Sequence, residues 1–153
     1  MNSQQRIQGE VMFKKSYKYY DKIYDQKDYE GETQILKGFI DEHLQSSGNR
    51  LLDVACGTGE HILHLKEQFE VEGLDLDPEL LQLAKEKNPE VSFHQGDMMA
   101  FDLGKQFDSI TCLFSAIGYA LSLENLNRAI GSMAQHLLPG GVLLIEPWFP
   151  KSY

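Results

Sequence analysis

The chain has 153 residues, of which 42% are hydrophobic and 24% charged, a length and composition typical of one globular domain. Acidic residues outnumber basic residues 23 to 14, and the formal net charge of −9 argues against a nucleic-acid partner because a phosphate backbone would be repelled. No apolar run approaches the roughly 18 residues of a membrane-spanning helix, and the first residues lack the apolar core of a signal peptide, so we expect a cytoplasmic protein with no membrane partner.

Residues 1–48 are expected to form a helical segment that acts as a lid or cap on the rest of the chain, residues 49–153. The first part of this segment, residues 11–29, is rich in tyrosine and lysine. Its second part, residues 32–44, carries apolar side chains at the spacing of one helix face, at Ile35, Phe39, Ile40 and Leu44. A polar break at residues 46–49 separates this helix from the first strand.

Strand and helix patterns alternate from residue 50 onward. The predicted strands are residues 50–55, 70–75, 91–95, 107–113 and 141–146, and the predicted helices are residues 59–69, 78–88 and 123–137. Pro78 after Asp77, and Ser122, mark two of the helix starts. The alternation predicts an α/β fold: a Rossmann-like doubly wound parallel sheet with helices on both faces and strand order 3-2-1-4-5. Its ligand crevice is expected at the carboxyl ends of the first and fourth strands.

A glycine turn follows the first predicted strand in the run Leu51–Gly59, and a carboxylate ends the second strand at Asp75. Gly57 and Gly59 allow a tight turn and the close approach of a ligand, and the following helix start offers unpaired N–H groups. Asp75 is placed to accept hydrogen bonds from both hydroxyls of a ribose. The combination predicts an adenosine-containing cofactor.

The residues after the glycine turn restrict the class of cofactor. A dinucleotide-binding loop would carry a third glycine where this chain has Ile62, and a phosphate-binding loop would carry a lysine and a serine or threonine after Gly59. Glu60 at the helix start would repel a pyrophosphate but tolerate a ligand with a sulfonium and an ammonium.

The motifs in this order resemble those of class I S-adenosylmethionine-dependent methyltransferases. The first motif is matched by Asp53, Ala55, Gly57 and Gly59, with alanine where many members have glycine; the later motifs are matched by residues 73–75, 95–98, 107–111 and 138–146. The resemblance implies that residues 49–153 form an S-adenosylmethionine-binding core. The cofactor-binding residues that it implies are Tyr20, Lys27, Asp53, Ala55, Gly57, Gly59, Asp75, Leu76, Gln95, Asp97, Met98 and Phe114.

A narrower resemblance is to N,N-dimethyltransferases that act on nucleotide-linked amino-deoxysugars. It rests on residues 20–29, on Phe114–Tyr119 and on Glu146–Pro150. It implies that a methyl group passes from S-adenosyl-L-methionine, leaving S-adenosyl-L-homocysteine, to an amine of a small-molecule acceptor. Tyr119 and Tyr20 are the catalytic candidates, and the candidate substrate contacts are Tyr24, Tyr119, Glu146 and Trp148. The alternative for the tyrosines is that they are half-buried packing residues with solvated hydroxyls.

The resemblance also carries an expectation about the sheet edge. Class I methyltransferases normally continue with a sixth and a seventh strand, for which this sequence has no counterpart, so we expect a truncated relative or a fragment. Residues 142–145 would then lie on an uncovered edge. We expect that edge to pair with a second copy, as a homodimer or a strand swap.

Two other functions stay open at this level. The chain could be a cofactor-binding module that is catalytically incomplete, or a nicotinamide-dependent (NAD) oxidoreductase, against which Ile62 and Asp97 argue. His61 and His64 are three residues apart on a predicted helix, but without a third ligand we expect surface histidines and no metal. Cys56 and Cys112 are expected to be small buried thiols.

Overall fold

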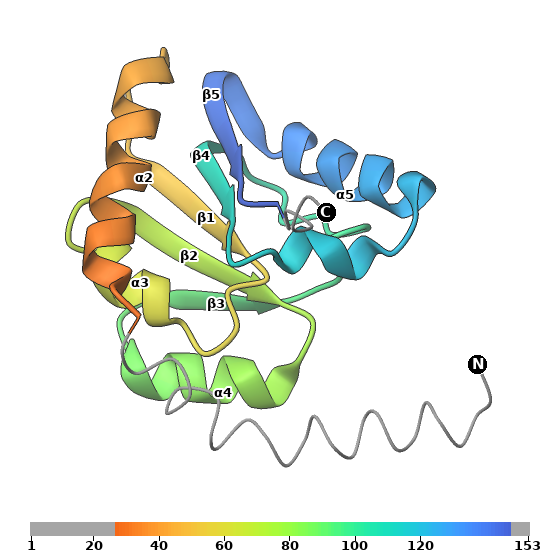
Figure 1. Ribbon diagram of the computed structural model, residues 1–153, viewed down its shortest axis with the longest axis horizontal. Helices are drawn as coiled ribbons and strands as arrows, with labels where there is room; N and C mark the ends of the chain where they lie inside the picture. The colour runs from red at the N-terminus through yellow and green to blue at the C-terminus, as the bar shows by residue number, and fades with distance from the viewer. Residues whose placement is uncertain (1–26, 148–153) are drawn as a thin grey trace, which may run out of the picture.

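A five-stranded parallel sheet organises the part of the chain that the computed structural model describes, residues 27–147 (Figure 1). Its strands are β1 (Arg50–Val54), β2 (Glu70–Asp75), β3 (Ser92–Gln95), β4 (Phe107–Cys112) and β5 (Leu137–Ile145). The spatial order is β3-β2-β1-β4-β5, and all four strand pairs are parallel. The doubly wound topology and the strand order predicted from the sequence are both confirmed.

Helices cover both faces of this sheet, as expected, and each face has its own apolar core. They are α2 (Tyr29–His43), α3 (Glu60–Leu65), α4 (Pro78–Lys87), the 3₁₀ helix η1 (Ala116–Ala120) and α5 (Leu123–Gln135). One core joins the sheet to α5 and η1 through Met133 and Ile117. The other joins it to α2 and α3 through Ile40 and Leu65. Because all the strands are parallel, their carboxyl ends lie at one edge of a sheet that is held between two helix layers.

Short polar side chains define where three helices begin. Asp28 accepts a hydrogen bond from the N–H of Gly31 at 2.8 Å and starts α2. Asp77 accepts one from Glu79 at 2.8 Å in front of Pro78, and Ser122 accepts one from Asn125 at 3.2 Å. Each side chain satisfies an N–H group that has no partner within its helix. The two starts predicted at Asp77 and Ser122 are confirmed.

Four predicted boundaries differ from the structure by two residues or more. The helix expected over residues 59–69 ends at Leu65, and the one expected over residues 32–44 begins at Tyr29 because Asp28 caps it. The helix expected over residues 123–137 ends at Gln135, and β5 begins at residue 137 rather than 141. Leu137 pairs with Phe107, and the register shifts before the next pair, Ser109 with Val142. This irregularity absorbs the residues that looked like a turn, including Gly140 with φ of +81°.

β5 forms one edge of the sheet, and α2 is only partly covered by the rest of the described chain. β5 pairs with β4 and, within residues 27–147, with no other strand, so the expected pairing with a second copy stays a prediction. Of the apolar residues on α2, Ile40 is fully buried whereas Ile35 and Phe39 are 63% and 52% exposed.

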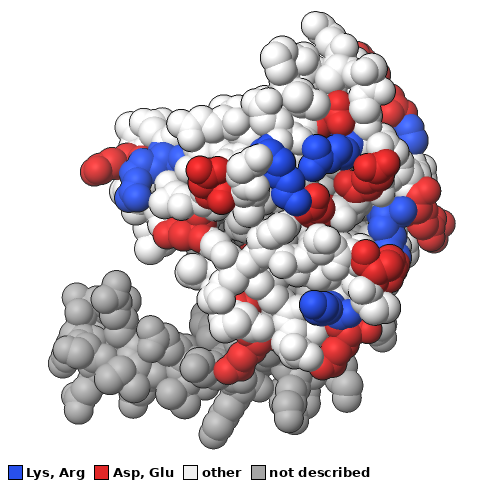
Figure 2. Space-filling view, turned by 180° about the vertical axis from the view of Figure 1, so that it is seen from behind, with Lys and Arg blue, Asp and Glu red and all other residues white. Residues whose placement is uncertain are grey.

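No described helix has the length and apolar character to cross a bilayer. Acidic and basic side chains are interspersed on the face that Figure 2 shows.

Candidate functional site

The loop after β1 and the end of β2 are joined by the carboxylate of Asp75. Its Oδ2 accepts a hydrogen bond from the N–H of Gly57 at 2.8 Å, and its Oδ1 accepts one from the N–H of Asp77 at 2.9 Å. Burial raises the pKa of Asp75, and these backbone hydrogen bonds partly offset that effect. A carboxylate has about four acceptor positions, so Asp75 can hold the loop and still accept hydrogen bonds from a ligand.

The two glycines of the loop have different roles, although both have positive φ. A Cβ at Gly57, with φ of +56°, would meet no atom within 4 Å. A Cβ at Gly59, with φ of +77°, would lie 3.0 Å from the Asn88 side chain and 3.2 Å from Ala84. The side chain of Asn88 also donates to the carbonyl of Gly59 at 3.3 Å. Gly59 therefore permits close packing of the loop on α4, and Gly57 is the position where the loop faces open space.

Asp53 lies beneath this loop in β1, with 2% of its surface exposed. Its Oδ1 accepts a hydrogen bond from the hydroxyl of Thr111 in β4 at 2.8 Å. Burial raises the pKa of Asp53 to about 7, the Thr111 hydrogen bond opposes this, and the neighbouring charge of Asp75 adds to it. Ala55, two residues on, has φ of +59°, the conformation that glycine adopts most easily.

The residues after β3 complete the side of the site beyond Asp75. The N–H of Gly96 donates to the carbonyl of Asp75 at 3.0 Å, and the side chain of Gln95 donates to the carbonyl of Leu76 at 3.3 Å. Asp97 accepts from the N–H of Met99 at 2.9 Å. Leu76 is 65% exposed, whereas Met98 is half-buried against the apolar core. The expected contacts around Asp75 are thus brought to one edge of the sheet.

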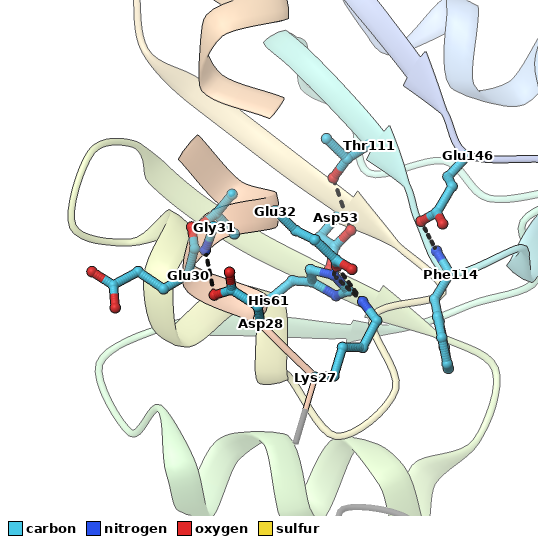
Figure 3. Close-up of polar contacts among 11 residues, drawn as sticks. Lys27, Asp28, Glu30, Gly31, Glu32, Asp53, His61, Thr111, Phe114 and Glu146 are labelled. Carbon is cyan, nitrogen blue, oxygen red and sulfur yellow. Dashed lines mark hydrogen bonds and ion pairs between the residues drawn. The ribbon is translucent and has the colours of Figure 1, made fainter. Parts of the chain in front are cut away.

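The other side of the site is formed after β4 and β5. Phe114 and Ser115 follow β4 with φ of +54° and +59°, and the N–H of Phe114 donates to the carboxylate of Glu146 at 2.7 Å. Glu146 follows β5, so this hydrogen bond ties the two strand ends together (Figure 3). Tyr119 lies in η1 and is 65% exposed.

A charged cluster of Lys27, Glu32 and His61 adjoins this second side (Figure 3). The ammonium of Lys27 forms an ion pair with Glu32, and His61 Nε2 lies 3.0 Å from the same carboxylate oxygen, Oε2. The Lys27 ammonium also lies 4.8 Å from the centre of the Phe114 ring, which places the cluster beside the end of β4. The expectation that His61 is a surface histidine is wrong: it is 9% exposed because α2 packs over α3.

Three candidate residues lie outside the described part of the chain: Tyr20, Tyr24 and Trp148. Cys112 is buried as expected, whereas Cys56 is only partly buried. Within residues 27–147, no three His, Cys, Asp or Glu side chains converge as a metal site.

Sequence reasoning missed the roles of Glu32, Thr111 and Asn88. Each acts on a residue 29 or more positions away, namely His61, Asp53 and Gly59. The sequence around Glu32 and Asn88 reads as an ordinary helix start and helix end. Thr111 lies in a strand whose six residues are all buried, and a buried hydroxyl normally has a polar partner.

Comparison with known proteins agrees with this geometry. Residues 51–141 match the family described as a methyltransferase domain. The chain is 43% identical over 129 residues, 83% of its length, to a dTDP-3-amino-3,6-dideoxy-alpha-D-glucopyranose N,N-dimethyltransferase of Streptomyces fradiae. It is 40% identical, again over 83% of its length, to a dTDP-3-amino-3,4,6-trideoxy-alpha-D-glucopyranose N,N-dimethyltransferase of Streptomyces venezuelae.

The fold is also similar to a solved structure of SAM-bound CalS10, an amino pentose methyltransferase from Micromonospora echinaspora involved in calicheamicin biosynthesis. The TM-score is 0.81 at 41% identity, over 85% of this chain and 56% of that one. The chain spans about half the length of the curated relatives it matches, 50% of the Streptomyces fradiae protein and 54% of the Streptomyces venezuelae protein.

Proposed function

Because this chain belongs to the methyltransferase-domain family, we propose that it binds S-adenosylmethionine and transfers the methyl group to the amine of a nucleotide-linked amino sugar. The family and the fold support the cofactor. The acceptor class is supported by the relatives, two of which are N,N-dimethyltransferases of dTDP-linked amino sugars.

The observation that carries the proposal is the cradle formed by Gly57 and Asp75. The loop has open space where a side chain at Gly57 would lie, and a buried carboxylate stands directly beside it. Open backbone next to a charged acceptor fits the ribose of an adenosyl group, which offers two hydroxyl donors. Glu60 at the start of α3 forms an ion pair with Lys87, so its charge is balanced and the expected repulsion of a pyrophosphate by Glu60 alone does not hold.

Each side of the site would contact a different part of the cofactor. Asp97, Met98, Gln95 and Leu76 adjoin Asp75 on the β3 side and would contact the adenine and ribose. Ala55, Gly59 and Asp53 belong to the β1 loop and its support. Lys27 and Phe114 lie on the β4 side, where an elongated ligand that starts at β3 would end.

Catalysis would depend mainly on positioning. Bound S-adenosylmethionine supplies a methyl group on a sulfonium, and an amine attacks it only when neutral and in line. The exposed Tyr119 in η1 is our candidate for contacting the acceptor amine, and Tyr20 is the second catalytic candidate. Glu146, with Tyr24 and Trp148, would line the acceptor pocket. The aromatic rings would favour the cationic groups of both substrates through cation–π attraction.

Calorimetric titration and a turnover assay test the proposal together. We expect S-adenosylhomocysteine to bind more tightly than NADH, and a dTDP-linked amino sugar to gain a methyl group when S-adenosylmethionine is supplied. Binding without product on any amine would leave a cofactor-binding module and refute the proposed transfer. Tighter binding of NADH than of S-adenosylhomocysteine would refute the cofactor assignment and favour the oxidoreductase alternative.

A further inference from the structure

The ammonium of Lys27 is held by more contacts than a surface lysine normally makes. Its side chain is 15% exposed, it forms an ion pair with Glu32, and it lies 4.5 Å from the centre of the Tyr29 ring and 4.8 Å from that of Phe114. A lysine side chain has four rotatable bonds, and most lysines leave their charge in water. The contacts with Glu32, Tyr29 and Phe114 therefore fix the ammonium in one place.

The carboxylate of Glu32 is in turn held by His61. Because an ionised carboxylate can only accept hydrogen bonds, the 3.0 Å contact requires a proton on His61 Nε2. The 3.5 Å contact between Lys27 Nζ and His61 Nε2 then joins two donors and adds no hydrogen bond. The His61 ring also packs edge-on against Tyr29, with 4.8 Å between the ring centres. His61 thus links α3 to the carboxylate on α2 that orients Lys27.

The ionisation of the cluster is consistent with this arrangement. Burial lowers the pKa of His61, which favours a neutral ring that donates from one nitrogen. Burial by itself would raise the pKa of Glu32, but the hydrogen bonds from Lys27 and His61 lower it below its ordinary value. The cluster therefore holds one cation and one anion.

The strand order places this cluster at the end of the site opposite Asp97. A ligand that contacts the end of β3 and then the end of β2 at Asp75 must cross β1 before it reaches β4, beside which Phe114 and Lys27 lie. In S-adenosylmethionine the part farthest from the adenine is an amino acid with a carboxylate. An ammonium has three N–H donors, so a cation paired with Glu32 can also donate to a second carboxylate.

We propose that Glu32 and His61 are positioning residues that hold the Lys27 ammonium where it recognises the carboxylate of the cofactor. The inference rests on the proposed function and deepens it, because it assigns the selection of the amino-acid end of the cofactor to α2 and α3 rather than to the glycine loop. Neither Glu32 nor His61 needs to touch the ligand.

The test compares two ligands that differ only in the carboxylate: S-adenosylhomocysteine and its decarboxylated analogue, S-adenosyl-3-thiopropylamine. Their dissociation constants are measured by calorimetry for the unaltered chain and for Lys27→Met, Glu32→Ala and Glu32→Gln. Asp41→Ala is the matched control, since Asp41 pairs with Lys37 on the exposed side of the same helix. Melting temperatures establish that each variant is folded.

The unaltered chain should prefer S-adenosylhomocysteine, and Lys27→Met should abolish that preference. Glu32→Ala should weaken the binding of S-adenosylhomocysteine by roughly three- to tenfold and leave the analogue unchanged. Glu32→Gln retains an acceptor for Lys27, so its affinity for S-adenosylhomocysteine should lie between those of the unaltered chain and Glu32→Ala. Asp41→Ala should bind both ligands as the unaltered chain does.

Equal weakening of both ligands by Glu32→Ala, or no weakening of either, would overturn the inference and leave the proposed function intact. The inference would also fail if Lys27→Met retained the preference for the carboxylate. Failure of the unaltered chain to bind S-adenosylhomocysteine at all would instead overturn the proposed function, and this inference with it.

Discussion

The carboxylate of Asp75 at the end of β2 accepts a hydrogen bond from the N–H of Gly57 at 2.8 Å, so one side chain both shapes the loop after β1 and belongs to the proposed cofactor site. Asp75→Asn should therefore weaken S-adenosylhomocysteine binding by a few kcal/mol at most, because charge-assisted hydrogen bonds become neutral ones. Calorimetric titration measures the change. Asp77→Ala is the control, since Asp77 caps α4 and its loss should lower stability by about 1 kcal/mol without comparable loss of affinity. Unchanged affinity in Asp75→Asn would show that the ribose lies elsewhere.

Replacing each loop glycine by alanine should separate ligand access from packing. Gly57→Ala introduces a methyl group into open space and should reduce affinity at least tenfold while costing only about 1–2 kcal/mol of stability through its positive φ. Gly59→Ala adds contacts with Asn88 and Ala84 to the same backbone strain and should destabilise the protein more. Thermal melting and calorimetry on both variants test this. If Gly57→Ala bound the ligand normally, the loop would not be the cradle.

The buried carboxyl of Asp53 should make the protein less stable as the pH rises. Its pKa is about 7 in the folded state against an ordinary value of 3.8, so the folded state retains a proton that the unfolded state releases. The free energy of unfolding should therefore fall between pH 4 and pH 7, by up to about 4 kcal/mol from this group. Asp53→Asn keeps an oxygen that can accept from Thr111 and should remove this part of the fall. Urea denaturation of both proteins across this pH range measures it, and parallel profiles would contradict the assignment.

Asp108, at the opposite end of the sheet, should affect stability without affecting the site. Its carboxylate accepts hydrogen bonds from the Ser46 hydroxyl at 2.6 Å and from the N–H groups of Gly48 and Arg50 at 3.1 and 3.0 Å. Burial opposes ionisation, but these hydrogen bonds lower the pKa of Asp108, so its stabilising effect is present near neutral pH and lost in acid. Asp108→Ala should lower the free energy of unfolding by about 2–4 kcal/mol.

The same Asp108→Ala protein, where folded, should bind S-adenosylhomocysteine as the unaltered chain does. Calorimetry below the lowered melting temperature measures this. A large loss of affinity in the folded variant would mean that the two ends of the sheet are coupled, contrary to the separation of roles argued for Asp75 and Asp108.

Local patterns in the sequence were sufficient for the architecture, and they indicated the glycine loop and the carboxylate that a hydrogen bond joins in the structure. Alternating strand and helix periods predict the sheet, because the direction in which successive side chains point is set by the backbone. Gly57 and Asp75 could be identified because a turn with positive φ and a carboxylate at a strand end are requirements that act within a few residues. The boundaries at residues 65 and 137 could not, because strand pairing and helix packing decide where an element stops.

The tertiary structure alone decided which distant side chains meet. His61 is buried because α2 packs over α3, and that packing brings it to a carboxylate 29 residues earlier in the chain. Asp53 acquires its raised pKa from burial between strands and its hydrogen bond from Thr111, 58 residues away. The difference between Gly57 and Gly59 likewise arises from α4, which covers one and not the other. Periodicity tells which face of an element turns inward, whereas the partner on that face is set by how the layers pack.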